Sequence, residues 1–103
     1  MRYCIDIDGT ICTPTIGRDY HKAEPWMDRI EVINKLYDEG HYIIIETARG
    51  YITKIDWYEK TKNQLDTWGV KYHELRTGVK MSADFYIDDK GMNASDFFKR
   101  GDY

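Results

Sequence analysis

The chain has 103 residues, which is enough for one domain with a modest hydrophobic core, so we assign residues 1–103 to a single domain. Its formal net charge of −3 argues against a broad basic surface, and we expect no nucleic-acid partner. The longest wholly apolar run, Ile43 to Ile45, is far too short to span a membrane, and no signal-peptide pattern precedes the first predicted strand. The two cysteines form neither a disulfide framework nor a zinc pattern. We interpret them as reduced thiols of a cytoplasmic protein, with Cys4 a small core residue.

Short β-prone segments alternate with helical patterns along the chain. Strands are expected at residues 2–6, 42–46, 70–75 and 84–87. This alternation predicts an α/β fold, an open parallel sheet of about four strands with flanking helices. In such sheets, ligands bind beyond the carboxyl ends of the strands.

Three helices are expected between and after these strands. The first runs from Pro25 to the stop at Gly40, with a buried stripe of Trp26, Ile30, Ile33 and Leu36 or Tyr37. The second begins at a capping box of Thr53 and Asp56, ends at Gly69, and has an apolar face of Ile55, Tyr58, Leu65 and Trp68. A short third helix covers 95–99, capped by Ser95 or Asn93.

Two carboxylates, Asp6 and Asp8, follow the first strand and precede Gly9 and Thr10. Carboxylates this close repel one another, so the site favours a cation or a shared proton, and Mg²⁺ prefers oxygen ligands of this kind. One aspartate could attack as a nucleophile while the other moves a proton. The alternative is a strand that leads into an ordinary Asx-type turn.

Other polar groups fall at the same predicted edge. These are Thr47 and Arg49 after the second strand, Lys80 before the last strand, and Asp88 and Asp89 after it. A phosphoester is anionic and repels carboxylates, so this set suits phosphoryl chemistry with Mg²⁺ as the bridge. Lys80 and the Thr47 hydroxyl can contact phosphate oxygens. Arg49 either orients the substrate phosphate or pairs with Glu46.

These motifs resemble those of the haloacid dehalogenase superfamily, in its phosphatase branch. The first motif of that superfamily, D-x-D-G-T, matches residues 6–10, and Thr47, Lys80 and the pair Asp88-Asp89 match the other three in order. The stretches T-A-R-G and K-x-x-A-D-x-Y-I-D-D are also similar to short proteins of bacterial capsule and lipopolysaccharide sugar synthesis. The resemblance implies a Mg²⁺-dependent phosphomonoesterase acting on a sugar phosphate.

The resemblance also implies a role for each residue. Asp6 would become an aspartyl phosphate, and Asp8 would protonate the leaving oxygen and then activate water. Thr47 and Lys80 would hold the phosphoryl group. The metal would be held by the Asp6 carboxylate, the Asp8 carbonyl and Asp88, with Asp89 acting through water or orienting the site.

Many members of the superfamily carry a cap domain, for which this chain has no room. Residues 11–24 are too few for a folded cap, and 51–79 are accounted for by one helix and one strand. We therefore expect a minimal, capless Rossmann-like core, in which a second subunit could supply the lid. The long loop at 11–24 either covers the site or is a solvated surface loop. Its Tyr20 and His21, with Trp26 nearby, are candidates for specificity or for a subunit contact.

Two other functions remain open. A receiver-like signalling domain also uses an acidic pocket, a hydroxyl and a lysine, but with the acidic pair and the phosphate acceptor in the opposite order. A non-catalytic protein that binds phosphate or Mg²⁺ would not need every motif intact.

Overall fold

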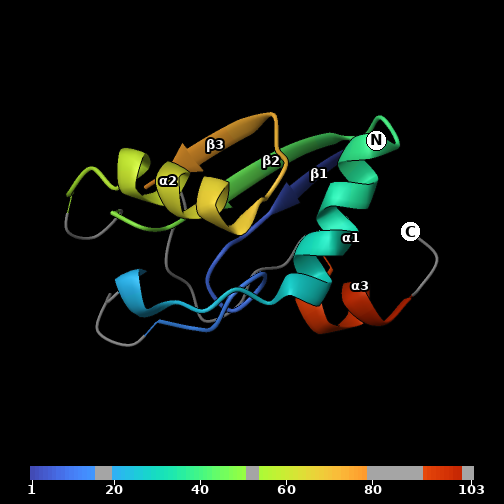
Figure 1. Ribbon diagram of the computed structural model, residues 1–103, viewed down its shortest axis with the longest axis horizontal. Coiled ribbons are helices and arrows are strands. Elements are labelled where there is room, and N and C mark those ends of the chain that lie inside the picture. The colour runs from blue at the N-terminus through green and yellow to red at the C-terminus, as the bar shows by residue number, and fades with distance from the viewer. Residues whose placement is uncertain (16–19, 51–53, 79–91, 101–103) are drawn as a thin grey trace.

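The computed structural model describes residues 1–15, 20–50, 54–78 and 92–100. The elements are β1 (Arg2–Ile5), a short 3-10 helix (Tyr20–Lys22), α1 (Met27–Asp38), β2 (Tyr42–Thr47), α2 (Tyr58–Trp68), β3 (Glu74–Thr77) and α3 (Ala94–Arg100). Strands and helices alternate as predicted (Figure 1). None of the described helices is long and apolar enough to span a membrane.

The described strands form one parallel sheet in the order β1-β2-β3, with β2 in the centre. Ile5 of β1 pairs with Ile45 of β2, and Thr47 of β2 pairs with Thr77 of β3. The predicted parallel sheet is confirmed. The described part has three strands rather than about four, because the segment expected as the fourth, 84–87, lies outside the described residues. The third strand also begins later than predicted, at Glu74.

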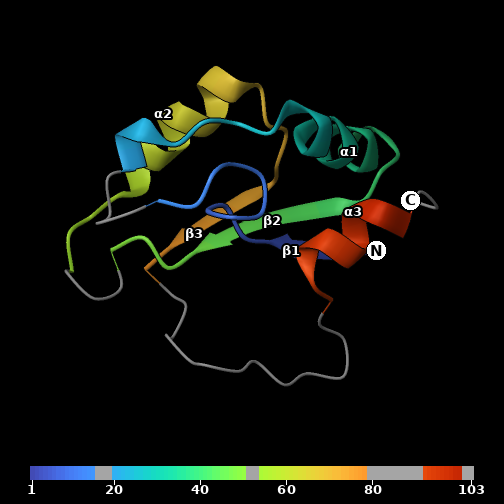
Figure 2. The ribbon, with the colours of Figure 1, turned by 90° about the horizontal axis from the view of Figure 1, so that it is seen from below.

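Helices α1 and α2 lie along the same face of the sheet (Figure 2). The predicted stripe of α1 is confirmed by its buried residues Ile30, Ile33 and Leu36. These side chains join the central residues of β2, Ile43 and Ile45, in one hydrophobic core. Continuous apolar residues in β2 are therefore explained by its place in the middle of the sheet.

The predicted start of α2 is wrong, and its predicted apolar face is confirmed only at Leu65, which is buried, and at Trp68, which packs against the core. The helix begins at Tyr58, and Asp56 precedes it and accepts a hydrogen bond from the Tyr58 amide at 2.9 Å, while Thr53 lies outside the described residues. Ile55 and Tyr58 are exposed, and the side chains that α2 buries are Thr61 and Leu65. In α3, the predicted cap is Asn93, whose Oδ1 accepts from the Ser95 amide at 2.9 Å.

Arg29 of α1 connects three parts of the chain. Its guanidinium lies 4.7 Å from the ring of Trp26 and 4.8 Å from the ring of Phe98 in α3. Its Nη1 also donates to the Thr10 carbonyl at 3.0 Å. Trp26 is therefore part of this cation–π stack, which fixes α3 against the start of α1 and against the turn after β1.

The prediction that Cys4 lies in the core is wrong. Cys4, expected in the core, is exposed, whereas Cys12 is 0% exposed and belongs to the core. Burial, and secondarily the nearby Asp8 carboxylate, raise the pKa of Cys12 to about 12.

Replacing Ile33 by alanine should lower the free energy of unfolding by about 2–5 kcal/mol, because the side chain is fully buried and leaves a cavity. Chemical denaturation monitored by circular dichroism measures this. Ile55→Ala is the matched control, since Ile55 is 56% exposed, and it should change stability by less than about 0.5 kcal/mol. Equal effects of the two substitutions would contradict the assignment of α1 to the core.

A thiol reagent at pH 8 should modify Cys4 rapidly and Cys12 only after denaturation. Cys12 is buried and its pKa of about 12 leaves almost no reactive thiolate at this pH. The time course of thiol release from an aromatic disulfide reagent gives the number of fast-reacting thiols. Cys4→Ser should remove the fast phase, and two fast-reacting thiols in the folded protein would contradict the structure.

Candidate functional site

Asp6 and Asp8 lie on a tight turn that begins where β1 ends. Ile7 between them is fully buried, and its carbonyl accepts hydrogen bonds from the Thr10 and Ile11 amides at 3.0 and 2.9 Å. The Gly9 amide donates to the Cys12 carbonyl at 3.0 Å, and Gly9 has a φ of +77°, a conformation that glycine adopts without strain. The backbone thus folds back on itself and fixes both aspartates at the carboxyl end of the sheet.

Thr47 is the last residue of β2 and is almost completely buried at this edge. Its Oγ1 accepts a hydrogen bond from the Arg49 amide at 3.3 Å. The hydroxyl therefore shapes the turn that follows β2 and starts the segment that carries Arg49.

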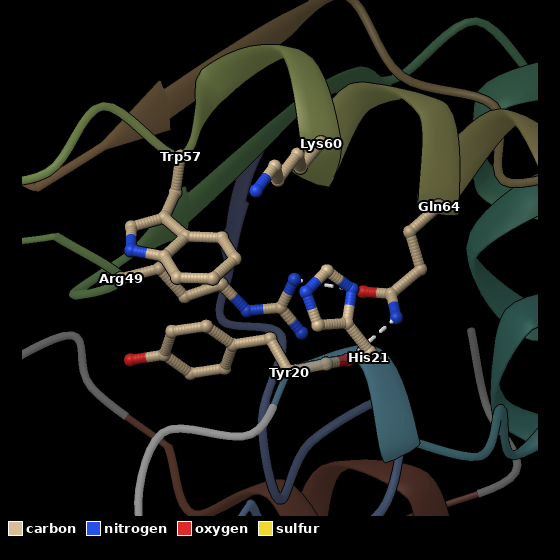
Figure 3. A pocket seen from close by; sticks show the side chains of 6 residues that line it. All are labelled: Tyr20, His21, Arg49, Trp57, Lys60 and Gln64. Carbon is tan, nitrogen blue, oxygen red and sulfur yellow. Dashed lines mark hydrogen bonds between the residues drawn. The ribbon is translucent and has the colours of Figure 1, made fainter.

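A pocket lies beside this edge, lined by Tyr20, His21, Arg49, Trp57, Lys60 and Gln64 (Figure 3). Its volume is about 130 Å³. Pockets for drug-sized ligands have volumes of about 300 Å³ or more, so this pocket has room for only one part of such a ligand. The residues come from the 3-10 helix, the turn after β2, and the first turns of α2 and the segment before it.

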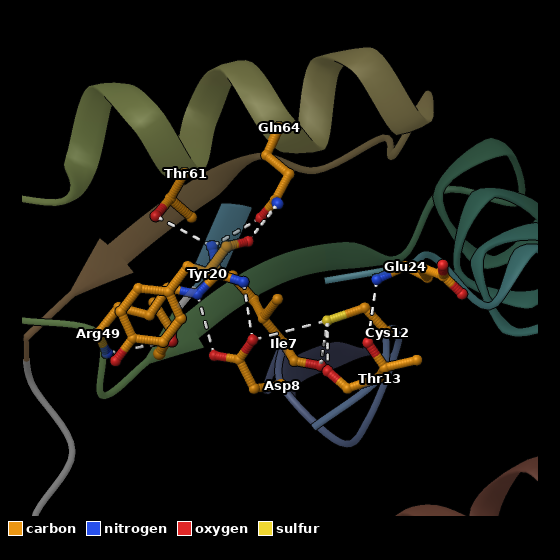
Figure 4. A network of polar contacts seen from close by, with 10 residues as sticks. Ile7, Asp8, Cys12, Thr13, Tyr20, Glu24, Arg49, Thr61 and Gln64 are labelled. Atoms are coloured by element: carbon orange, nitrogen blue, oxygen red, sulfur yellow. Dashed lines mark hydrogen bonds and ion pairs between the residues drawn. The ribbon is translucent and has the colours of Figure 1, made fainter. Parts of the chain in front are cut away.

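Arg49 joins the pocket to the turn after β1 (Figure 4). Its side chain is only 2% exposed, and it forms a bidentate ion pair with Asp8, with Nε to Oδ2 at 2.9 Å and Nη2 to Oδ1 at 2.7 Å. Nη1 donates to Gln64 Oε1 at 2.7 Å and to Thr61 Oγ1 at 3.4 Å, both on α2. The Tyr20 ring covers the guanidinium at 4.5 Å.

This arrangement corrects one of the two readings of Arg49. Glu46, its expected alternative partner, instead lies 3.8 Å from Arg76. Arg49 pairs with Asp8, and its other donors point to Thr61 and Gln64. A buried guanidinium with four hydrogen bonds to its neighbours is suited to hold Asp8 in one orientation.

Sequence reasoning missed Thr61 and Gln64. Both are polar residues on the side of α2 that faces the site. They are three residues apart, so they lie on the same face of the helix. Gln64 also donates through Nε2 to the Tyr20 carbonyl at 2.8 Å, which positions the 3-10 helix. No pattern in the sequence marks these residues, because their partner is a side chain from a different segment.

The described part of the 11–24 loop covers the site. The Thr13 amide donates to the Glu24 carbonyl at 2.9 Å and the Glu24 amide to Thr13 Oγ1 at 3.0 Å, which closes the base of the loop. Tyr20 and His21 then reach the pocket. Of the two readings of this loop, the structure favours the covering one for these residues.

The donor set after β1 suits a hard cation. Asp6 supplies a carboxylate, and within the described chain no group donates to the Asp8 carbonyl, which leaves that oxygen available as a ligand. Both oxygens of the Asp8 carboxylate are engaged by Arg49. Lys80, Asp88 and Asp89 lie outside the described residues, and the described ones alone contain no group of three acidic, histidine or cysteine residues placed to hold a metal ion.

Comparisons with known proteins show the fold and the family of the chain. A crystal structure of a protein from Vibrio cholerae superimposes with a TM-score of 0.83 and 29% sequence identity, over 95% of this chain and 87% of that one. None of the curated proteins compared with the chain matches it significantly. Residues 3–74, which include Asp6, Asp8, Thr47 and Arg49, match the family model of the haloacid dehalogenase-like hydrolases. The chain therefore belongs to the haloacid dehalogenase-like hydrolase family.

Proposed function

We propose that the chain is a Mg²⁺-dependent phosphomonoesterase that works through a phosphorylated Asp6. The observation that carries the proposal is the rigid placement of Asp8 two residues after Asp6 by the bidentate Arg49 contact. A hydrolytic cycle needs a second carboxylate beside the nucleophile, and family membership supports a hydrolase.

The reaction would proceed in two displacements. An Asp6 carboxylate oxygen attacks phosphorus, the bond from phosphorus to the ester oxygen breaks, and a proton from Asp8 goes to the leaving oxygen. Asp8 then takes a proton from water, whose oxygen attacks phosphorus and releases Asp6 and inorganic phosphate. Mg²⁺, held by the Asp6 carboxylate, the Asp8 carbonyl and Asp88, would offset the negative charge that otherwise keeps a phosphoester away from Asp6.

The other residues would have supporting roles. Thr47 and Lys80 would contact the transferring phosphoryl oxygens, with Asp89 orienting the metal site. We assign Arg49 to the positioning of Asp8 rather than to the substrate phosphate, because four of its five N–H groups are already engaged. The substrate would be a sugar phosphate of bacterial surface polysaccharide synthesis, as the resemblance of the T-A-R-G segment implies.

Phosphate release from p-nitrophenyl phosphate and a panel of sugar phosphates should require Mg²⁺ and stop with EDTA. Asp6→Asn should reduce turnover by at least about a thousandfold, because it removes the nucleophile. Asp8→Asn should allow Asp6 to be phosphorylated by a substrate with a good leaving group but slow its hydrolysis. Malachite-green detection measures release, and mass spectrometry detects the phosphorylated protein.

Absence of release from every compound by folded, Mg²⁺-loaded protein would contradict the proposal. A long-lived phosphate on Asp6 of the unmodified protein would instead support the receiver-like reading.

Arg49→Lys should lower kcat by about tenfold or more and change KM little, because lysine keeps the charge but cannot form the two-point contact with Asp8. Steady-state kinetics with p-nitrophenyl phosphate measure both constants. Arg76→Lys is the matched control, since Arg76 is an exposed arginine whose ion pairs within the described chain are with Glu46 and Glu74 of the sheet. A raised KM with unchanged kcat would contradict this role and support the alternative that Arg49 binds the substrate phosphate.

A further inference from the structure

The pocket beside Arg49 carries positive charge that the proposed chemistry does not use. Its lining includes Lys60, Arg49 and His21 and contains neither aspartate nor glutamate, although the protein has a net charge of −3. The positive charge of Arg49 is compensated by its ion pair with Asp8. Lys60 therefore supplies the cation that a ligand in the pocket would meet.

The environment of Lys60 differs from that of the other lysines whose ion pairs the structure shows. Lys35, Lys62 and Lys71 each pair with a carboxylate. Within the described chain, Lys60 pairs with none, and its Nζ lies 5.1 Å from the centre of the Trp57 ring, pointing into the pocket (Figure 3). An ammonium held on an aromatic face without a carboxylate is well placed to bind an anion.

The remaining walls are aromatic. The rings of Tyr20 and Trp57 meet edge to face at 4.9 Å, and His21 lies 5.8 Å from Trp57. Tyr20 also covers the guanidinium of Arg49, which in turn holds Asp8. A molecule that occupies the pocket thus lies next to the arginine that orients the proton-transfer group. Flat rings flanked by a few polar groups suit the apolar face and the hydroxyls of a sugar ring.

We propose that this pocket binds the leaving group of a sugar phosphate that carries a second anionic substituent, and that Lys60 pairs with that substituent. The inference rests on the proposed phosphatase function, because it places in the pocket beside Arg49 the sugar whose oxygen leaves phosphorus with a proton from Asp8. A carboxylate and a second phosphate both satisfy this requirement, since either would pair with the Lys60 ammonium.

A matched pair of substrates tests the charge. Glucose 1-phosphate and glucuronic acid 1-phosphate differ only at carbon 6, where a carboxylate replaces the hydroxymethyl group. We expect kcat/KM to be at least about tenfold higher for the acidic sugar. Glucose 1,6-bisphosphate tests the second phosphate in the same way. Lys60→Gln should remove the preference, with kcat/KM for the acidic sugar falling by about tenfold or more. Lys62→Gln, on the same helix but paired with Asp66, is the control and should keep the preference.

Binding separates this inference from the phosphatase proposal. Calorimetry on Asp6→Asn protein with Mg²⁺, which needs no turnover, should give a tighter Kd for the acidic sugar phosphate, and adding Lys60→Gln should abolish the difference. If no compound is hydrolysed and this binding pattern is still found, the pocket assignment stands and the phosphatase proposal fails. If p-nitrophenyl phosphate is hydrolysed but neither acidic sugar is preferred, or Lys60→Gln leaves the preference intact, the pocket assignment is overturned.

Discussion

The ion pair between Arg49 and Asp8 is the constraint on which the rest of the site depends. A guanidinium that is 2% exposed cannot remain without partners, because the loss of its hydration would cost several kcal/mol. Asp8 compensates the charge, while Gln64 and Thr61 accept two further hydrogen bonds. These contacts bind the turn after β1, the turn after β2 and α2 into one unit. The geometry of the proposed chemistry is therefore a consequence of satisfying one buried cation.

Much of this architecture could be predicted from local patterns. The alternation of β-prone and helical segments gave a parallel sheet, and the spacing of Ile30, Ile33 and Leu36 gave the buried face of α1. Placement of Asp6 and Thr47 followed because parallel strands bring their carboxyl ends to the same edge. These features depend on the spacing of apolar residues and on the order of the elements along the chain, and both can be read from the sequence.

Other features depend on contacts between distant segments, and no local pattern carries them. Arg49 could reach Glu46 or Asp8, and only the fold decides between them. Thr61 is buried beside the same arginine, so a polar side chain occupies part of the buried face of α2. Cys4 was misjudged for a related reason, because its exposure depends on which face of the sheet it occupies.

The cation–π stack around Arg29 joins parts of the chain that are synthesised at different times, the turn after β1 and helix α3. The turn that carries the two aspartates is made early, yet one of its carbonyls, that of Thr10, is held by an arginine whose other face rests on Phe98 of α3. Contacts of such large sequence separation form late, because a long loop must close first. The ribosome therefore releases this turn before Phe98, one of the residues that hold Arg29 in place, has been made.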